Sequence, residues 1–497
     1  MNQTIRPMPR VLIDTTTGCL CDKKKQAEAF KALPVYAELV STMTMELDYA
    51  RIWREVKEFF RYVMFSHRWE DDEPLLQKVE RTTVYKLEVS PANTKLQSFC
   101  KLVDSFGFRW AWSDTCCVDK VNNVVLQESL VAMFSWYRGS SLTVVHLIGV
   151  WSDSQESGDL YGSIWNTRAW TYQEYVAAKV VQFYTEDWKP YLGLTMFNHK
   201  ESHDVVSEMG RVSGISSQQL AVLSPGLDRA REKLYLASTR QTTLVEDIAY
   251  SLLGIFNVSI PVIYGEGHRA VGRLLEHILM GSGDVTILAW TGPAGTYNSC
   301  LPMDLTVYSQ LLPLHVPSLI ETSEMNQAAT NLRSSLPDLT PAMTLYDRLH
   351  ELPPPSMAAN RLRLPGIVFL LTDLAHVSGP DPQTGFHVYH AITSTFGNID
   401  IKTADDLTET KDLYLVHPWI GPLLDQEFSC GAAALDRTTQ ALRIVVRLRQ
   451  PFGALLFKSL SRVEYQRVAA DSLIMVQVHE EVPLTDLVDN IRTIEVH

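Results

Sequence analysis

The chain has 497 residues and a formal net charge of −13 at pH 7; 46% of its residues are hydrophobic and 20% are charged. This composition is typical of a soluble globular protein, and the length predicts about two to four domains. The acidic balance, without any long basic run, argues against a nucleic-acid partner, because binding a phosphate backbone needs clustered Lys and Arg.

The sequence gives no sign of a membrane span or a secretory leader. No stretch reaches the roughly 18 consecutive apolar residues that a membrane helix requires, and the N-terminal stretch MNQTIRPMPRV lacks the apolar core of a signal peptide. We therefore expect a cytoplasmic protein. The seven cysteines are scattered, at positions 19, 21, 100, 116, 117, 300 and 430. Because they lack the paired spacing of a zinc site, we expect reduced thiols and no metal.

Residues 60–190 alternate between short apolar runs and segments with a helical period. The predicted strands are 61–67, 108–114, 142–150 and 179–185. The predicted helices between them are KLQSFCKLVDSFG, LQESLVAMFSWYRG and a helix that starts in WNTRAWTYQE. Strands that alternate with helices predict crossover connections and a doubly wound, mostly parallel sheet with helices on both faces.

Polar side chains follow three of these predicted strands. In an open parallel sheet the ligand crevice lies beyond the carboxyl ends of the strands. We therefore expect the polar clusters to converge on one rim, close enough to share a ligand. The clusters are Ser66-His67-Arg68-Trp69, Asp114-Thr115-Cys116-Cys117, and the helix start around Glu174.

The pattern changes twice further along the chain. Residues 1–200 form the predicted α/β domain, and 201–300 are a predicted helical extension, with helical spacing in LVEDIAYSLLGIF and HRAVGRLLEHILM. Residues 301–360, rich in Ser, Asn, Thr and Pro from about 320 onward, are a predicted linker. Residues 361–497 are a predicted β-rich domain.

One segment of that last domain shows a period of two. In QALRIVVRLRQ, apolar residues at 442, 444, 446 and 448 alternate with Arg443, Arg447 and Arg449. Alternation of this kind predicts a strand with one buried face and one solvated arginine face.

Six blocks of the sequence occur in a specific order and cover roughly residues 10 to 290. They are RVLIDTTTG, YVMFSHRWED, WSDTCCVDK, LQESLVAMFSWYR, TRAWTYQE with FYTEDWKPYLG behind it, and ASTRQTTLVEDIAYSLLGIFNVSIPVIYGEG. In this order they resemble the fungal heterokaryon-incompatibility (HET) domain, in the form common in mushroom-forming fungi. The resemblance implies an effector of non-self recognition after cell fusion and of programmed cell death. The C-terminal part carries no such motif.

The same resemblance implies a distant relation to TIR domains, some of which cleave NAD at the nicotinamide ribose bond with a glutamate at the start of a helix. Glu174 matches that position. The resemblance therefore implies an NAD(P) glycohydrolase with NAD or NADP as a nucleotide substrate, no bound cofactor, and activation through a protein partner or self-association.

We expect Glu174, His67 and Asp114 to be the catalytic residues. Glu174 would bind the ribose hydroxyls and stabilise the oxocarbenium-like charge; His67 would act as general acid or base. Asp114 would orient His67 or a ribose hydroxyl. Asn166 or Thr167 would cap the helix. The expected ligand-binding residues are Ser66, Arg68, Trp69, Arg168, Trp170, Cys116 and Asp119, with the arginines towards phosphate and Trp170 as a pocket wall.

Each candidate also has a structural interpretation. Glu174 suits the first turn of a helix, where the dipole favours an acid, with Trp170 as core. Asp114 suits a turn after a strand. Three alternatives to the glycohydrolase stay open: a non-enzymatic protein-interaction module, a biosynthetic enzyme on the same fold, and an enzyme with a Cys116 or Cys117 thiolate and His67 as its base.

Overall fold

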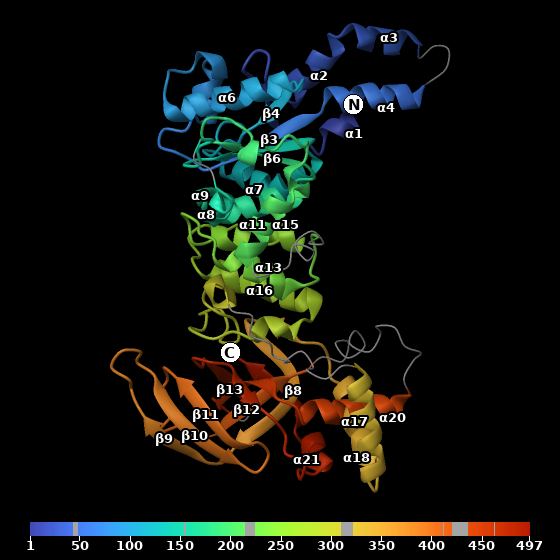
Figure 1. The fold of residues 1–497 in the computed structure, drawn as a ribbon, viewed down its shortest axis with the longest axis vertical. Helices are drawn as coiled ribbons and strands as arrows, with labels where there is room; N and C mark the ends of the chain where they lie inside the picture. The colour runs from blue at the N-terminus through green and yellow to red at the C-terminus, as the bar shows by residue number, and fades with distance from the viewer. Residues whose placement is uncertain are drawn as a thin grey trace. The chain divides into compact units, whose positions relative to one another are not determined.

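The computed structural model describes residues 1–42, 48–153, 156–213, 224–309, 322–410, 412–419, 436–461 and 463–497. The chain divides into two compact units, the first made of Met1–Gly226 and Thr239–Val262 and the second of Leu227–Ser238 and Ile263–His497 (Figure 1). The second unit thus takes one helix, α13 (Ala230–Ser238), from within the sequence of the first. Every helix among the described residues is too short or too polar to span a bilayer.

The first unit is built on a six-stranded sheet with the order β2-β1-β4-β3-β5-β6. Its strands are β1 (Val11–Asp14), β2 (Cys19–Asp22), β3 (Tyr62–His67), β4 (Trp110–Trp112), β5 (Leu142–Leu147) and β6 (Val181–Thr185). The last four run parallel to one another, which confirms the predicted mixed α/β fold with a parallel sheet. The antiparallel β1–β2 hairpin at one edge was not predicted.

Every residue of the four parallel strands is buried, so both faces of the sheet are covered. The connecting helices are α6 (Pro91–Ser105), α7 (Asn123–Gly139) and α10 (Ala169–Ala177). The Ser90 side chain accepts a hydrogen bond from the Asn93 backbone and so caps α6. Gly107, at φ +77°, follows its end, as the glycine stop signal predicts.

The connections reverse direction at β3. The chain passes from β3 through α6 to β4 on one side, then through α7 to β5 on the other. The Tyr62 hydroxyl donates to the Trp136 carbonyl of α7, whereas the Phe65 ring stacks on Phe99 of α6. These contacts place α6 and α7 on opposite faces of the sheet. The reversal brings together the carboxyl ends of β3 and β5, where open sheets of this kind bind ligands.

The helical prediction for LVEDIAYSLLGIF is confirmed only in part. Two short helices lie there, α14 (Asp247–Tyr250) and α15 (Leu253–Phe256). At Gly254 a Cβ atom would lie 2.2 Å from the Cβ of Phe134, so glycine is required for the close approach of α15 to α7. The helix predicted from HRAVGRLLEHILM is α16 (Arg269–Ser282).

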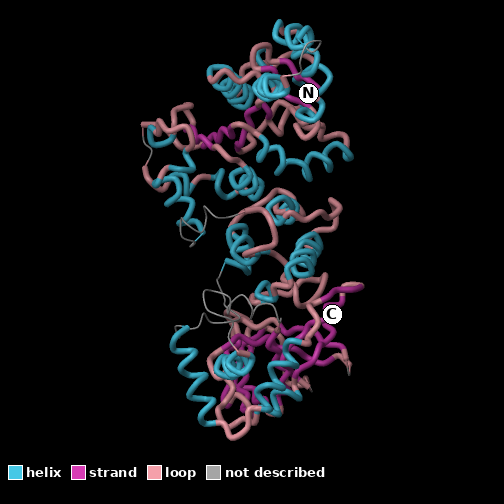
Figure 2. Tube along the Cα trace, turned by 90° about the vertical axis from the view of Figure 1, so that its right-hand side faces the viewer, coloured by secondary structure: helices cyan, strands magenta, loops and turns pink. Residues whose placement is uncertain are grey.

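The second unit contains a seven-stranded sheet and a three-stranded sheet, β11-β10-β9. The strands are β7 (Ser356–Ala358), β8 (Arg361–Leu371), β9 (Leu374–Ser378), β10 (His387–Thr393), β11 (Gly397–Thr403), β12 (Leu413–Pro418), β13 (Phe452–Ser459), β14 (Glu464–Val468), β15 (Ile474–Val476) and β16 (Ile491–Val496). Because β8 pairs with both β12 and β16, five of these strands form a closed ring of pairings. The β-rich C-terminal region is thereby confirmed; its strands and helices lie against one another in Figure 2.

Two predictions for this unit are wrong. The predicted linker carries α17 (Thr322–Ser335) and α18 (Thr340–His350), and the predicted strand QALRIVVRLRQ is the helix α20 (Arg437–Leu448). Its buried residues include Ile444 and Val445, which a strand would send to opposite faces. Arg443, predicted on a solvated face, is also buried. The apolar run fits both periods, and packing against the core decided between them.

The helical state of 437–448 is testable at its cap. Asp436 accepts a hydrogen bond from the Thr439 backbone at 3.0 Å. Because loss of such a cap costs about 1 kcal/mol, we expect Asp436→Ala to raise amide exchange in the first turn of α20 about fivefold. Hydrogen-exchange mass spectrometry would measure this, with α6 of the first unit as internal control. Unchanged exchange would contradict the capping role.

Candidate functional site

Strand β3 ends in two polar residues that point to opposite faces of the sheet, because successive side chains of a strand alternate. The Ser66 hydroxyl donates to the Glu174 carboxyl on α10. The His67 ring instead stacks on Phe65, with centroids 4.1 Å apart, and its Nε2 lies 3.6 Å from Oε1 of Glu73. Side chains on opposite faces of the sheet do not share one ligand site, so the expectation that His67 and Glu174 do so is wrong. The strand divides the polar residues into two clusters.

The first is the Glu174 cluster, which consists of Ser66, Tyr137, Trp165 and Glu174. The Trp165 indole donates to the Ser66 hydroxyl at 2.8 Å, and that hydroxyl donates to Glu174. The Tyr137 hydroxyl, which donates to a β3 carbonyl at 2.9 Å, also lies at the carboxyl. Glu174 is only 7% exposed. Its carboxyl is thus oriented by neighbours and nearly cut off from solvent.

Two expectations about this helix are corrected. Glu174 lies in the second turn of α10, and the first turn holds no acidic residue. The helix dipole therefore does not explain its presence. Neither Asn166 nor Thr167 caps α10: the N-cap is Arg168, without a side-chain bond. Asn166 Oδ1 accepts from Arg240 at 2.9 Å instead.

The protonation of Glu174 is strongly perturbed. Burial, and secondarily the nearby Asp114 charge, raise the pKa of Glu174 to about 8, although the Ser66 hydrogen bond opposes this shift. The carboxyl is therefore mostly protonated at neutral pH. A cation bound beside it would favour the ionised form. A buried carboxyl whose ionisation is also disfavoured by a neighbouring charge is typical of a functional site rather than of a core.

Asp114 lies in the turn after β4, where it also meets the loop that follows β3. Its Oδ2 accepts from the Trp69 indole at 2.8 Å. The nitrogen of Lys120 lies 3.3 Å from the centroid of the Trp69 ring. Predicted β4 extended to 114, but it ends at Trp112, because the Ser113 carbonyl already accepts from Cys117 in a turn. The structure thus brings Asp114 and Trp69 together, as expected for a shared rim.

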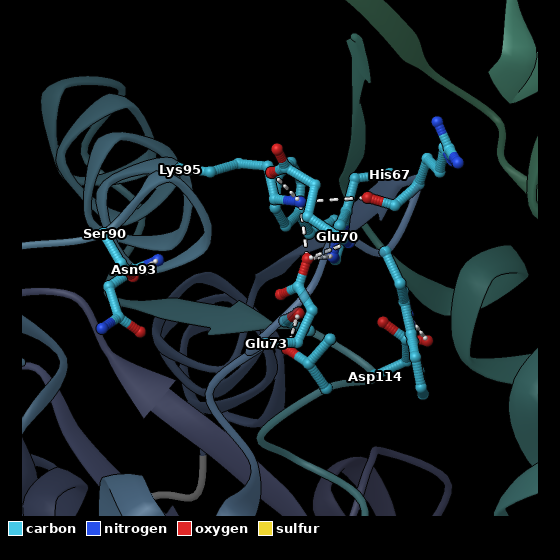
Figure 3. A network of polar contacts seen from close by, with 12 residues as sticks. His67, Glu70, Glu73, Ser90, Asn93, Lys95 and Asp114 are labelled. Atoms are coloured by element: carbon cyan, nitrogen blue, oxygen red, sulfur yellow. Dashed lines mark hydrogen bonds and ion pairs between the residues drawn. The ribbon is translucent and has the colours of Figure 1, made fainter.

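The second is the Lys95 cluster, which consists of His67, Glu70, Glu73 and Lys95. Lys95 reaches from α6 and lies between the two glutamates, 2.8 Å from Glu70 and 2.6 Å from Glu73 (Figure 3). Its nitrogen also donates to the Arg68 carbonyl at 3.0 Å. The loop 68–73 is thereby fastened to α6.

Charge in the Lys95 cluster is well compensated. Burial alone would raise the pKa of Glu73, but His67 and the Lys95 ammonium lower it to about 2. The Lys95 side chain is only 5% exposed, so the ion pair is shielded from water and salt. We interpret this cluster as the support of the loop that carries Trp69.

The backbone carbonyls of the two predicted phosphate contacts, Arg68 and Arg168, each accept a hydrogen bond. The Arg68 carbonyl accepts from Lys95, and the Arg168 carbonyl accepts from Arg240 at 3.0 Å. The Arg168 charge is nevertheless felt at Glu174, where it opposes the rise in pKa.

Three other predicted ligand residues are engaged elsewhere. The Trp170 indole donates to Asp247 of α14 at 3.2 Å. Asp119 accepts from Gln77 at 3.0 Å. Cys116 and Cys117 are buried, and burial raises the pKa of Cys117 well above its usual range. A thiolate nucleophile needs the opposite shift, so Cys117 does not support the Cys–His alternative.

Several residues that shape the rim were not predicted from the sequence. Trp165 lies within the very stretch WNTRAWTYQE, where Trp170 was chosen as the pocket wall. One feature of the sequence could have indicated the Lys95 cluster, namely the acidic run after β3 that contains Glu70 and Glu73. Arg240 bonds Asn166 and fixes the start of α10. Its only signal is its place in the block ASTRQTTLVED. The described residues hold no group of three or more side chains suited to a metal, and their six cysteines are free; Cys430 lies outside them.

Part of the first unit, including residues of this rim, matches a known protein family. Residues 62–161 match the family model described as Heterokaryon incompatibility protein (HET). This chain contains a HET domain. The match begins at β3 and includes Ser66, Lys95 and Asp114, and it ends in α8 (Asp159–Gly162), before Glu174.

One known protein resembles a longer part of this chain than the family model does. The vegetative incompatibility protein HET-E-1 of Podospora anserina is 35% identical over 248 residues, which cover 47% of this chain and 17% of that protein. The chain therefore spans less than a fifth of the relative's length. No solved structure matches the chain significantly.

The buried Glu174 carboxyl predicts a pH-dependent stability. The pKa of Glu174 rises from 4.5 to about 8 on folding. The protonated carboxyl therefore contributes its full stabilisation of the folded state below about pH 4.5, and this contribution is lost as pH rises towards 8. Relative to wild type, the free energy of unfolding of Glu174→Gln should gain on the order of 5 kcal/mol between pH 4 and pH 9. Urea unfolding across this range would measure it. A difference that does not vary with pH would contradict the raised pKa.

The Lys95 cluster predicts a second effect. Lys95→Met leaves two glutamates without their cation, and loss of one partner of a buried ion pair costs about 3 kcal/mol. We expect lower stability and faster amide exchange in the loop 68–73. Lys101→Met, which removes an exposed lysine from the same helix, is the matched control. Equal effects of both substitutions would show that the cluster does not fasten the loop.

Proposed function

We propose that the HET domain is TIR-like and cleaves NAD or NADP at the nicotinamide ribose bond, and that the protein is a cytoplasmic fungal effector of non-self recognition and programmed cell death. The observation that carries the enzymatic part is the buried Glu174 carboxyl, whose pKa is raised to about 8 beside Asp114. The likeness to a vegetative incompatibility protein supports the biological part.

The TIR-like architecture is supported by the order of the strands. The connections between the four parallel strands reverse direction at β3, as in doubly wound sheets. Glu174 lies on α10, which connects β5 to β6, and reaches the end of β3 through Ser66. A ligand at the switch point between β3 and β5 would thus meet this carboxyl.

The chemistry follows from the charge that develops on the sugar. Departure of nicotinamide leaves positive charge at the ribose carbon, and water then attacks it to give ADP-ribose and a proton. The bound nicotinamide ring is itself cationic, so it favours ionisation of Glu174. An ionised carboxylate in a site of low dielectric stabilises the oxocarbenium-like transition state more than it would in water. The hydrogen bonds from Trp165 and Ser66 fix its position beforehand.

The proposal predicts turnover that depends on this carboxylate. With NAD or NADP, and a crowding agent to promote self-association, the full chain should release nicotinamide. Glu174→Gln should lower the rate by about 10² to 10³, the usual loss for one preorganised electrostatic group. The value of kcat/KM should rise with pH and level off above about 8, because it reports the free enzyme and ionised Glu174 is the active form. Glu88→Gln, at an exposed glutamate of the same unit, should leave it unchanged.

Two results would decide against the enzyme. Nicotinamide release that is undiminished in Glu174→Gln would make the carboxyl structural, and no release by assembled wild type would exclude the glycohydrolase. Cell death on overexpression distinguishes the glycohydrolase from the main alternative. If Glu174→Ala, in protein shown to be folded, remained toxic, a non-enzymatic interaction module would be favoured.

A further inference from the structure

Lys120 has unused hydrogen-bonding capacity at the rim. Its ammonium nitrogen is buried and has no hydrogen-bond partner in the part of the chain that the structure describes. It lies 3.3 Å from the centroid of the Trp69 ring, and a cation–π contact leaves the N–H donors of the ammonium unpaired. A buried ammonium without hydrogen bonds costs free energy. Packing alone therefore does not account for a lysine at this position.

The acidic neighbours of Lys120 are committed to other groups. Asp114 accepts from Trp69, and Glu73 is paired with Lys95. Burial of the ammonium lowers the pKa of Lys120, and the charges of Asp114 and Glu73 only partly oppose this shift. The donors of Lys120 are thus available to an anion, which would also favour its charged form.

Trp69 covers this nitrogen from the solvent side. The indole is 40% exposed, although the nitrogen beneath it is buried. Trp69 belongs to the loop 68–73. Lys95 holds this loop through ion pairs with Glu70 and Glu73, which follow Trp69 in the sequence. Rotation of the indole would break its single hydrogen bond to Asp114 and uncover Lys120 without unfastening the loop.

We propose that Lys120 is the phosphate-binding residue of the rim, and that the Trp69 indole covers it until an anionic ligand enters. The inference rests on the proposed function and deepens it, since it assigns the group that takes the pyrophosphate of a dinucleotide. Asp114 is an electrostatic neighbour of both Lys120 and Glu174. The phosphates and the reacting ribose would then lie on either side of Asp114.

The test is calorimetric titration of the full chain with inorganic pyrophosphate at low salt. Wild type should bind saturably, and added NaCl should weaken binding. Lys120→Met keeps an apolar side chain of similar length against Trp69 but removes the charge, so binding should weaken at least tenfold. Lys120→Arg should retain most of the affinity. Lys101→Met, at an exposed lysine of α6, should bind like wild type.

The outcomes separate this inference from the glycohydrolase. Absence of binding to wild type, or equal binding by Lys120→Met, would overturn it. A lower melting temperature of Lys120→Met with unchanged affinity would also overturn it, and would leave Lys120 as a packing partner of Trp69. Pyrophosphate has no glycosidic bond, so its binding is measured apart from turnover. Lys120-dependent binding without NAD cleavage would sink the proposed function and leave this inference intact.

Discussion

The cost of ionising the buried Glu174 carboxyl beside Asp114 is the constraint around which the first unit is arranged. Glu174 and Asp114 lie near enough for one charge to be felt at the other, and burial adds to the cost of ionising Glu174. A hydrophobic residue at 174 would avoid that cost. The unit instead orients the acid through Ser66 and Trp165 and fixes the start of its helix through Arg240. Stability given up in this way is typical of a site that needs the strained group.

The alternation of side chains along β3 separates this destabilised acid from a compensated ion-pair network. Ser66 faces α10 and the Glu174 cluster, whereas His67 faces α6 and the Lys95 cluster. On the α6 side two glutamates share one lysine, so the charges there are paired and rigid. On the α10 side the acid has only neutral donors and the more distant Arg168. One side supports a loop, and the other is left ready to respond to a charged ligand.

Much of the sheet could be predicted because its strands and helices have distinct periods. The rim followed from parallel connections alone. The opposite orientation of Ser66 and His67 could also have been predicted, because adjacent side chains of a strand alternate between its faces. The two residues were instead assigned to one cluster because they are neighbours in the sequence. The roles of Trp165 and Lys95 could not be read, because their partners lie 99 and 22 residues away. The segment 437–448 was misassigned because its apolar run satisfies a strand and a helix equally, and only tertiary packing distinguishes them.

The two perturbed groups at the rim respond to burial in a complementary way. Burial drives Glu174 towards its neutral acid and Lys120 towards its neutral amine. A cationic group of a ligand would favour the charged form of the first, and an anionic group would favour that of the second. A ligand with a cationic ring and anionic phosphates would stabilise both charges at once, so the rim favours such a ligand over one that carries either charge alone.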